Sequence, residues 1–211
     1  MTDHIIKTDR NNNLLKDVKS THKILVEYFL KNHSLNEKEI LFLVQLFTYK
    51  SVKRDIRLIE EGQVWDKVYI VKSGILRFYY TTPCGKFFNK GFFNDGNIIW
   101  PITPSSRSKP SLFNIETLTD CDVWVASFYD FREALMCLNL WEQFSFTLIE
   151  AITEEKFIRE YEFLVNDAES RFTNLKKRIG HITERIADYH TASYLGISPV
   201  ALSRIKKRLK N

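Results

Sequence analysis

Hydrophobic positions follow different spacings in successive parts of the chain. A helical spacing over residues 34–47 gives way, between about 52 and 125, to short runs rich in β-branched and aromatic residues. The helical spacing returns over 131–165, with an interruption near residue 140, and again over 188–209. This order predicts an α+β chain in which helices flank one strand-rich domain.

Glycine turns divide the strand-rich region at regular intervals. Gly62, Gly74, Gly85 and Gly96 recur every 11 or 12 residues, which is the spacing of a strand plus a turn in antiparallel sheets. Pro83-Cys84-Gly85-Lys86 has the composition of a hairpin turn. We therefore predict an N-terminal antiparallel β-roll of the double-stranded β-helix or jelly-roll type. The runs lie at 68–71, 75–80, 87–88, 92–93, 114–118 and 123–125.

Local signals predict two helix starts and one long loop. Ser34 and Glu37 have the spacing of a capping box, and Asp167 is the expected cap of a helix that restarts after the long one. Prolines and serines crowd residues 101–110, which are expected to form the longest irregular loop because proline removes ladder hydrogen bonds.

The 131–165 segment carries two apolar stripes. The first consists of Phe144, Leu148, Ala151 or Ile152, and Ile158, and the second of Phe157, Tyr161 and Leu164. One stripe can cover the roll while the other needs a partner, so we expect a helix pair between two copies of the chain. Burial of both stripes within one subunit is the alternative. The residues assigned to the dimerisation helix are Leu148, Ile152, Ile158 and Tyr161.

Residues 188–209 have the pattern of a helix, a tight turn and a second helix. Ala192 is small enough for the second helix to cross closely, and Gly196 can take the positive φ that ends a helix. Ser198 and Pro199 suit the cap and the first position of the next helix. The segment is therefore a candidate helix-turn-helix.

The second of these helices has an apolar stripe and a polar, basic face. Leu202, Ile205 and Leu209 recur at i, i+3 and i+7, and the other side carries donors suited to base edges and phosphates in a major groove. A solvated basic end of a helical hairpin is the alternative. The residues assigned to DNA contact are Ser198, Pro199, Val200, Ser203, Arg204, Lys207 and Arg208.

Positive charge is concentrated in the same segment. From Arg171 onward, ten Lys or Arg residues face only two acids, Glu184 and Asp188, giving 10 − 2 = +8. The whole chain is +5, so residues 1–170 sum to −3. This distribution is typical of a nucleic-acid-binding module, whose affinity comes largely from displaced counterions.

The composition limits the number of domains, the location and the cysteine chemistry that the chain can have. With 211 residues and 44% hydrophobic residues, the chain can form one large or two small domains with a packed core. It lacks an apolar run near the roughly 18 residues of a membrane span and an N-terminal secretory pattern, so a cytoplasmic location is expected. Cys84, Cys121 and Cys137 are odd in number and far apart, which favours buried thiols over a disulfide framework.

Enzyme motifs are missing from the pattern. A cupin-like barrel would need two or three histidines and a carboxylate converging on a metal, but no histidine falls between Ser34 and Gly180. A phosphate-binding glycine loop and a Gly-x-Ser-x-Gly elbow are also missing. We therefore expect no enzyme activity, no metal and no cofactor.

The order of roll, long helix and helix-turn-helix resembles the Crp/Fnr family of bacterial transcription regulators, from about Ser34 to Leu209. The resemblance implies a homodimer that binds double-stranded DNA through a winged-helix-like domain, with the roll as sensor of a small-molecule effector. It also implies that Arg204 lies where the family uses an arginine against guanine, with Ser203 beside it. The matching segments are 59–62, 66–77, 85–86, 92–96, 192–198 and 202–205.

The chain lacks the residues with which members of the family bind cyclic AMP. Members that bind cyclic AMP carry Gly-Glu after the glycine turn and an Arg-Ser or Arg-Thr pair before the next strand. Here Asn97 follows Gly96, and Arg107-Ser108 lies in the proline-rich loop. We expect an effector other than cyclic AMP, or none. The candidate effector pocket consists of Ile98, Ile99, Trp100 and Arg107.

Two further departures concern the DNA-binding and N-terminal regions. Pro199 and Val200 stand where many relatives have Glu or Arg, so the operator should differ. The sequence ends at Asn211, directly after the reading helix, so wing strands are not expected. No cysteine precedes Cys84, so the N-terminal iron–sulfur ligands of the oxygen-sensing branch are not expected either.

Four parts are predicted from these patterns: a tail over 1–20, a sensor roll over 21–130, a dimerisation helix over 131–166 and a helix-turn-helix domain over 167–211. Asn166 to Ser170 is the expected hinge between sensor and reader. The alternative function is a signalling module that binds a small molecule or a protein and has only nonspecific affinity for DNA.

Overall fold

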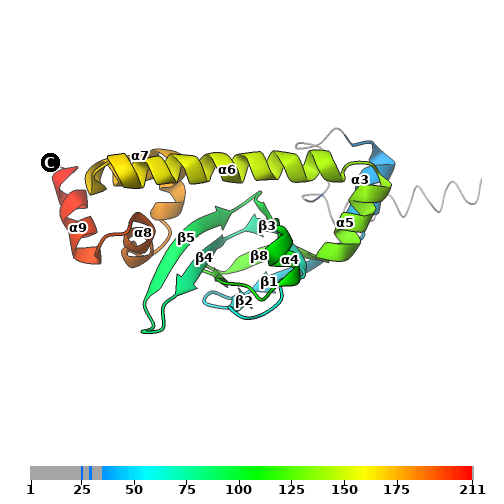
Figure 1. Cartoon of the computed structure of the whole chain (residues 1–211), viewed down its shortest axis with the longest axis horizontal. Coiled ribbons are helices and arrows are strands. Elements are labelled where there is room, and N and C mark those ends of the chain that lie inside the picture. The colour runs from blue at the N-terminus through cyan, green and yellow to red at the C-terminus, as the bar shows by residue number, and fades with distance from the viewer. Residues whose placement is uncertain (1–24, 26–28, 30–34, 211) are drawn as a thin grey trace, which may run out of the picture.

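A computed structural model describes residues 25, 29 and 35–210. It contains a β-roll, a long helix that runs along it, and a helical C-terminal domain at the far end of that helix (Figure 1). The elements are α3 (Glu37–Val44), β1 (Thr48–Val52), β2 (Arg57–Ile59), β3 (Lys67–Ser73), β4 (Ile75–Thr81), β5 (Phe87–Asn94), β6 (Ile98–Ile99), α4 (Pro104–Ser108), β7 (Asn114–Thr117), β8 (Cys121–Ser127), α5 (Phe128–Cys137), α6 (Trp141–Val165), α7 (Ala168–Thr183), α8 (Asp188–Leu195) and α9 (Pro199–Arg208).

The strands form two four-stranded sheets, in the orders β1-β8-β3-β6 and β2-β7-β4-β5. All pairings are antiparallel, with Tyr69 opposite Val125 in one sheet and Arg77 opposite Glu116 in the other. The predicted antiparallel roll is thus confirmed. The predicted runs 87–88 and 92–93 are two ends of a single strand, β5.

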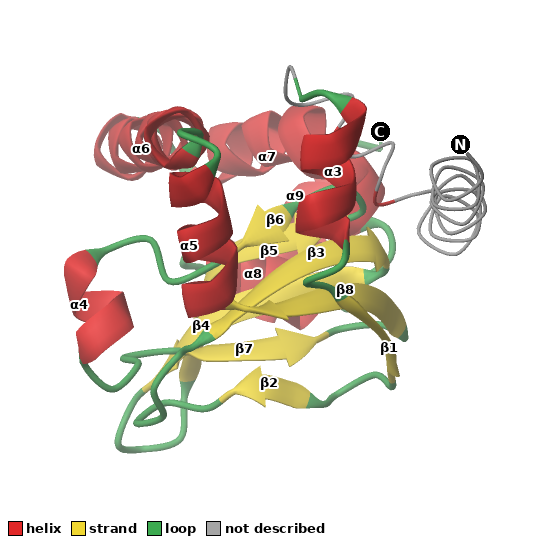
Figure 2. Ribbon diagram, turned by 90° about the vertical axis from the view of Figure 1, so that its right-hand side faces the viewer, coloured by secondary structure: helices red, strands yellow, loops and turns green. Residues whose placement is uncertain are grey.

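Apolar side chains gather on both sides of the first sheet. Helices α3, α5 and α6 lie on one side of the strands (Figure 2), where they enclose Trp100, Phe131 and Phe144. Between the two sheets a second cluster includes Leu76 and Ile115, both fully buried. The roll is therefore stabilised by burial on two faces, because each sheet surface that leaves water contributes to the hydrophobic effect.

Two local predictions were wrong in detail. Helix α3 is capped by Asn36, whose side chain accepts from the backbone N–H of Glu39 while the Glu39 carboxylate accepts from the Asn36 N–H at 2.8 Å. Of the predicted pair, Ser34 lies outside the described residues, and Glu37 is the first residue of α3 rather than its third. The 101–110 loop contains the short helix α4, capped by Thr103.

The predicted burial of the cysteines is confirmed for one of the three. Cys121 is buried as predicted, but Cys84 and Cys137 are exposed, since they lie in the hairpin turn and at the end of α5. The predicted tail over 1–20 lies outside the described residues. Within the part of the chain that the structure describes, no helix has both the length and the apolar character needed to cross a membrane.

Helix α6 has two opposite apolar faces, as its sequence predicted. The inner face packs on the roll: Phe144 is buried, Leu148 lies against the core around it, and Ile152 lines a cavity. Leu148 and Ile152, which were assigned to the dimer contact, are thus partly buried against their own roll, whereas Ile158 and Tyr161 are 37% and 59% exposed. The outer face consists of Phe146, Ile149, Phe157, Tyr161 and Leu164, all exposed.

The C-terminal domain is docked on the roll through α8, which lies beside β5 (Figure 1). The Asn89 side-chain amide donates to the backbone carbonyl of His190 at 2.9 Å, and the Ser193 hydroxyl donates to the carbonyl of Phe87 at 3.1 Å. Ile75 and Ile182 belong to one buried cluster that joins the two domains. These contacts set the position of α8 relative to the roll.

Candidate nucleic-acid interface and roll cavity

The turn between α8 and α9 has the predicted conformation. Gly196 has φ of 69°, and a side chain there would place Cβ 2.9 Å from a ring carbon of Phe163 in α6. Helix α9 then begins at Pro199, where the Ser198 hydroxyl accepts from the backbone N–H of Ala201 at 3.1 Å. Glycine is needed because an L side chain would meet both the left-handed strain and Phe163.

The inner side of α9 holds the helix in the domain. Leu202 and Ile205 are buried in one cluster with Phe172 and Leu175 of α7. Leu209, predicted in the same stripe, is 49% exposed, because it is the C-cap of α9. Two residues of the predicted stripe therefore fix the orientation of α9.

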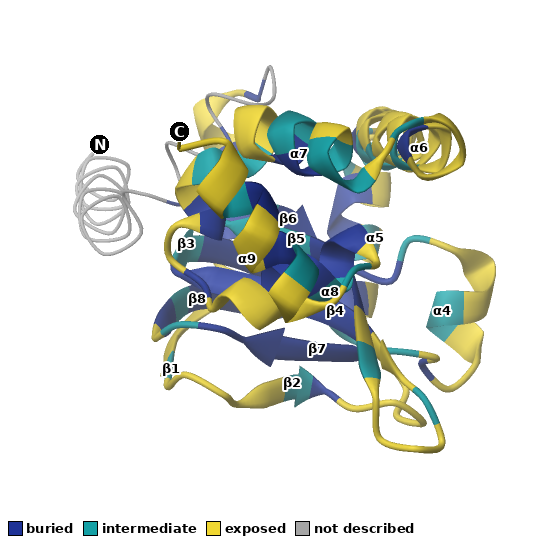
Figure 3. Cartoon of the chain, turned by 90° about the vertical axis from the view of Figure 1, so that its left-hand side faces the viewer, coloured by how far each residue is buried: buried dark blue, intermediate teal, exposed yellow. Residues whose placement is uncertain are grey.

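The outer side of α9 is open to solvent (Figure 3). Val200 is 61% exposed, and Ser203, Arg204 and Lys207 are exposed on the same helix. Among the described residues, the side chains of Arg204 and Lys207 make no hydrogen bond or ion pair. These two cations are therefore available to a ligand.

The neighbouring cations on α9 are partly engaged within the domain. Arg208 pairs with the Glu169 carboxylate of α7 at 2.5 Å, and Lys206 pairs with Asp188 at the start of α8. Sequence reasoning assigned Arg208 to DNA without this pair, since the position of α7 was unknown. Arg208 can contact a phosphate only in competition with Glu169.

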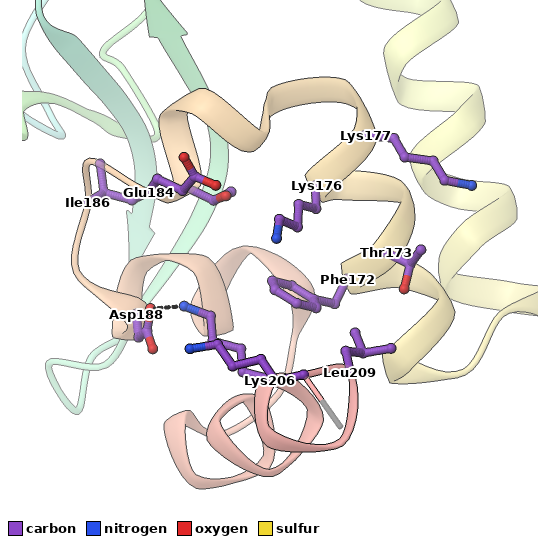
Figure 4. A pocket seen from close by; sticks show the side chains of 11 residues that line it. Phe172, Thr173, Lys176, Lys177, Glu184, Ile186, Asp188, Lys206 and Leu209 are labelled. Atoms are coloured by element: carbon purple, nitrogen blue, oxygen red, sulfur yellow. Dashed lines mark hydrogen bonds and ion pairs between the residues drawn. The ribbon is translucent and has the colours of Figure 1, made fainter.

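A groove of about 730 Å³ extends the basic surface from α9 towards α7 (Figure 4). Lys176 of α7 and Lys206 of α9 line it together with Phe172, and the Lys206 ammonium is directed towards Asp188. Lys177 and Lys210 add further positive charge to its lining, against Glu184 and Asp188. The potential around the reading helix is thus positive on more than one side.

A second hollow, of about 320 Å³, lies inside the roll beneath α6. Ile98, Ile99 and Trp100 line it, so three members of the candidate effector pocket are found together. Arg107 is not part of the lining. Its guanidinium instead donates to the carbonyl of Pro101 at 3.0 Å and to the carbonyl of Ile102.

Sequence reasoning missed the charged residue of this cavity. Lys90 of β5 lines it, with Nζ 4.2 Å from the centre of the Phe113 ring. Loss of solvation, together with repulsion from Lys156 and Arg159, lowers the pKa of Lys90 to about 8. A lysine within a phenylalanine-rich strand was the only signal in the sequence.

Comparison with known proteins agrees with this architecture. Residues 49–136 match the family model of the cyclic nucleotide-binding domain. The solved structure of FixK2 from Bradyrhizobium japonicum is 16% identical, covers 78% of this chain and 84% of its own, and superposes with a TM-score of 0.69. The chain has the Crp/Fnr fold. A comparison by sequence with curated proteins found no match.

Other structures with the Crp/Fnr fold give similar values. A transcriptional regulator of the family from Eubacterium rectale is 16% identical, with 87% of this chain and 88% of that chain covered and a TM-score of 0.68. CLP from Xanthomonas campestris, a c-di-GMP responsive global regulator, is 13% identical over 83% and 92% of the two chains, with a TM-score of 0.63. At these identities the likeness concerns the fold.

Proposed function

We propose that this chain is a homodimeric, sequence-specific DNA-binding transcription regulator whose roll senses an effector. The observation that carries the proposal is the outer face of α9, where Arg204 and Lys207 are exposed and unpaired on a helix that is capped and held by its apolar side. A net charge of +8 from Arg171 onward supports attraction to phosphates. Arg204 can reach a guanine edge, and Lys207 a phosphate.

The outer face of α6 supports a dimer. Phe146, Phe157, Tyr161 and Leu164 are each at least 59% exposed and recur on one side of the helix. A row of large apolar side chains on a helix surface is typical of a subunit interface. Pairing two α6 helices along this face presents two reading helices, as a near-palindromic site with half-sites about 34 Å apart requires.

The residues around the roll do not fit cyclic AMP. The family's cyclic-AMP binders use a glutamate after the glycine turn and an arginine against the phosphate. Here Asn97 follows Gly96 and its side chain accepts from the backbone N–H of Asn94 at 2.8 Å. Arg107 is held by two backbone carbonyls outside the cavity. We therefore propose an effector of another chemical class.

A footprinting experiment on genomic fragments from the host tests the regulator. The expected result is one or a few protected sites with two half-sites a helical turn apart, bound at salt concentrations where random DNA is released. Equal binding to every fragment, with no protected site, would support the alternative of a signalling module with only nonspecific affinity for DNA.

A further inference from the structure

Lys90 is the extra residue of a β-bulge. Across the β4–β5 pairing, Phe78 lies opposite Gly91 and Tyr79 lies opposite Asn89, so Lys90 has no residue opposite it. A bulge redirects a side chain out of the regular alternation of a strand, and bulges are frequent beside functional sites. In this chain the bulged residue lines the cavity beneath α6.

The ammonium group of Lys90 is surrounded by aromatic rings. It lies 4.2 Å from the ring centre of Phe113, 5.5 Å from that of Tyr80 and 5.9 Å from that of Phe78. Among the described residues its side chain makes no ion pair with a carboxylate. A cation partly removed from water without an anionic partner is costly, so the site favours binding of an anion.

The other charged residues of the lining add to this preference. Lys156 and Arg159 of α6 contribute two more positive charges, and Glu155 is the one carboxylate among the described lining residues. The Arg159 guanidinium donates to the backbone carbonyls of Asn89 and Lys90. Within the part of the chain that the structure describes, the Lys90 ammonium has no such acceptor and lies near the ring of Phe113 in the cavity lining. The lining carries three cations and one acid, a net of +2.

Trp65 offers a further polar group. It lines the cavity and is 4% exposed, and its indole N–H has no hydrogen-bond partner among the residues that the structure describes. A buried donor without an acceptor is destabilising, so an acceptor atom from a ligand would be stabilising. Most of the remaining lining is apolar or aromatic, with Phe78, Phe93 and Trp100 as examples.

We propose that this cavity binds a small organic monocarboxylate with an aromatic body, with the Lys90 ammonium as counter-ion of its carboxylate. The volume of about 320 Å³ is at the small end of ligand sites, which suits one or two rings. The inference rests on the proposed function, since it names the class of effector that the sensor roll takes.

The bulge also connects the cavity to the DNA-binding domain. The Arg159 guanidinium donates to the carbonyl of Lys90 at 3.0 Å and to the carbonyl of Tyr194 in α8 at 3.0 Å. The neighbouring Asn89 holds His190 of α8. An anion that draws Lys90 towards it acts on two neighbouring residues of β5, Asn89 and Lys90, whose contacts position α8, so occupancy of the cavity changes the docking of the C-terminal domain.

Calorimetric titration of the full-length protein with paired probes tests the ligand class. The probes are benzoate, phenylacetate and 1-naphthylacetate, each beside its neutral amide. At least one acid is expected to bind at least about tenfold more tightly than its amide, because a hydrogen bond between charged groups is stronger than one to a neutral acceptor. If no acid is preferred over its amide, or if cyclic AMP binds more tightly than every acid, the proposal is wrong.

Two variants, Lys90→Met and Trp65→Phe, locate the site, and Lys86→Met is the control. Lys90→Met removes the charge and should abolish the preference for acid over amide, while Lys86→Met, at an exposed lysine of the same hairpin, should keep it. Trp65→Phe keeps a ring but loses the N–H, and should weaken acid binding several-fold, as a lost hydrogen bond predicts. Thermal melting of each variant checks folding. A preference that survives in Lys90→Met overturns the assignment.

Footprinting of the same protein sample separates this inference from the proposed function. A protected DNA site together with failure of every acid would contradict the ligand class alone. If the protein binds no specific DNA site with or without ligand but still prefers an acid over its amide, the proposed regulator function is wrong. The proposed ligand class then remains supported.

Discussion

Nη1 of Arg77 in β4 lies 3.1 Å from Nδ1 of His190 in α8. A guanidinium can only donate hydrogen bonds, so the ring must accept through Nδ1 and is therefore neutral. Both residues are buried, at 7% and 3% exposure, and 113 positions separate them in the sequence. This contact joins the β-roll to the C-terminal helical domain and makes their docking sensitive to the charge of one imidazole.

Acidification should weaken the folded, docked protein. Burial and the positive charge of Arg77 lower the pKa of His190 to about 4, from its ordinary value of 6.5. The unfolded chain therefore binds a proton first, and stability is lost as the pH falls from 6.5 towards 4, by at most about 1.4 kcal/mol per pH unit. Urea unfolding at pH 7 and pH 5 measures this difference.

A glutamine variant separates this effect from general titration. In His190→Gln the pH dependence between 5 and 7 should shrink, because the group that titrates has gone. Identical pH profiles for the wild type and His190→Gln would show that His190 does not control docking.

Removal of the Arg77 side chain should destabilise the fold strongly. Its Nη2 lies 2.7 Å from the Glu116 carboxylate, which is buried and also accepts from the Tyr79 hydroxyl at 2.9 Å. Arg77→Ala leaves that carboxylate with only the exposed Arg57 guanidinium, 3.7 Å away, as a cation, and breaking a buried pair costs up to about 3–5 kcal/mol. Denaturant unfolding measures the loss. Arg54→Ala, at an exposed pair, should change stability by about 0.5 kcal/mol or less.

The two free cations of α9 should have different roles. Arg204→Ala should relax specificity at one base pair by about 1–3 kcal/mol. Lys207→Ala should weaken binding to every sequence and reduce the salt slope by about one. Competition gel shifts with single-base operator variants, repeated at several salt concentrations, distinguish the two patterns. Lys50→Ala on the roll should change neither, and the same pattern for Arg204 and Lys207 would contradict this division.

A charge on the outer face of α6 should separate the dimer. Phe157 is 64% exposed at the centre of that face, and Phe157→Glu would place two acids in a symmetric apolar contact. The dimer dissociation constant should rise on the order of a hundredfold, about 2.7 kcal/mol. Sedimentation over a concentration series measures it. Met136→Glu on α5, also an exposed apolar position, is the matched control; an unchanged dimer in Phe157→Glu would rule out this face.

The turn before the reading helix should not tolerate a side chain. Gly196→Ala combines a left-handed φ, which costs roughly 1–2 kcal/mol, with a Cβ placed 2.9 Å from Phe163. Thermal unfolding and DNA binding should both be impaired. Gly180→Ala in α7 meets only ordinary contact with Lys176 and should be neutral or stabilising by up to about 1 kcal/mol. Equal stability of both variants would contradict the strain argument.

Local signals explain what the sequence predicted well. Gly196, Ser198 and Pro199 act on their own neighbours, so the turn and the start of α9 could be located without knowing the tertiary structure. Where two local signals compete, they mislead. Ser34 and Asn36 each have a glutamate three residues later, and only packing decides that Asn36 is the cap.

Contacts between distant elements could not be predicted in this way. Lys90 lines the cavity because of a register shift against β4, and that shift is invisible in β5 alone. Arg107 is adjacent in sequence to the cavity residues, but backbone carbonyls hold it elsewhere. The pair of Arg77 and His190 depends on how two domains dock. Helix α9 was therefore predictable, and the charged part of the roll cavity was not.

Helix α6 alone lies between the roll cavity and the outer apolar face. Its inner face closes the cavity through Ile152 and Glu155, and its outer face carries Phe157 and Leu164. In the proposed dimer the two cavities are then only two helix diameters apart, about 20–24 Å. Each cavity is closed by the α6 helix of its own subunit, and in the proposed dimer the two α6 helices pack on each other. A ligand that moves one α6 therefore also moves the wall of the second cavity, so the first and second ligands should bind with unequal affinity.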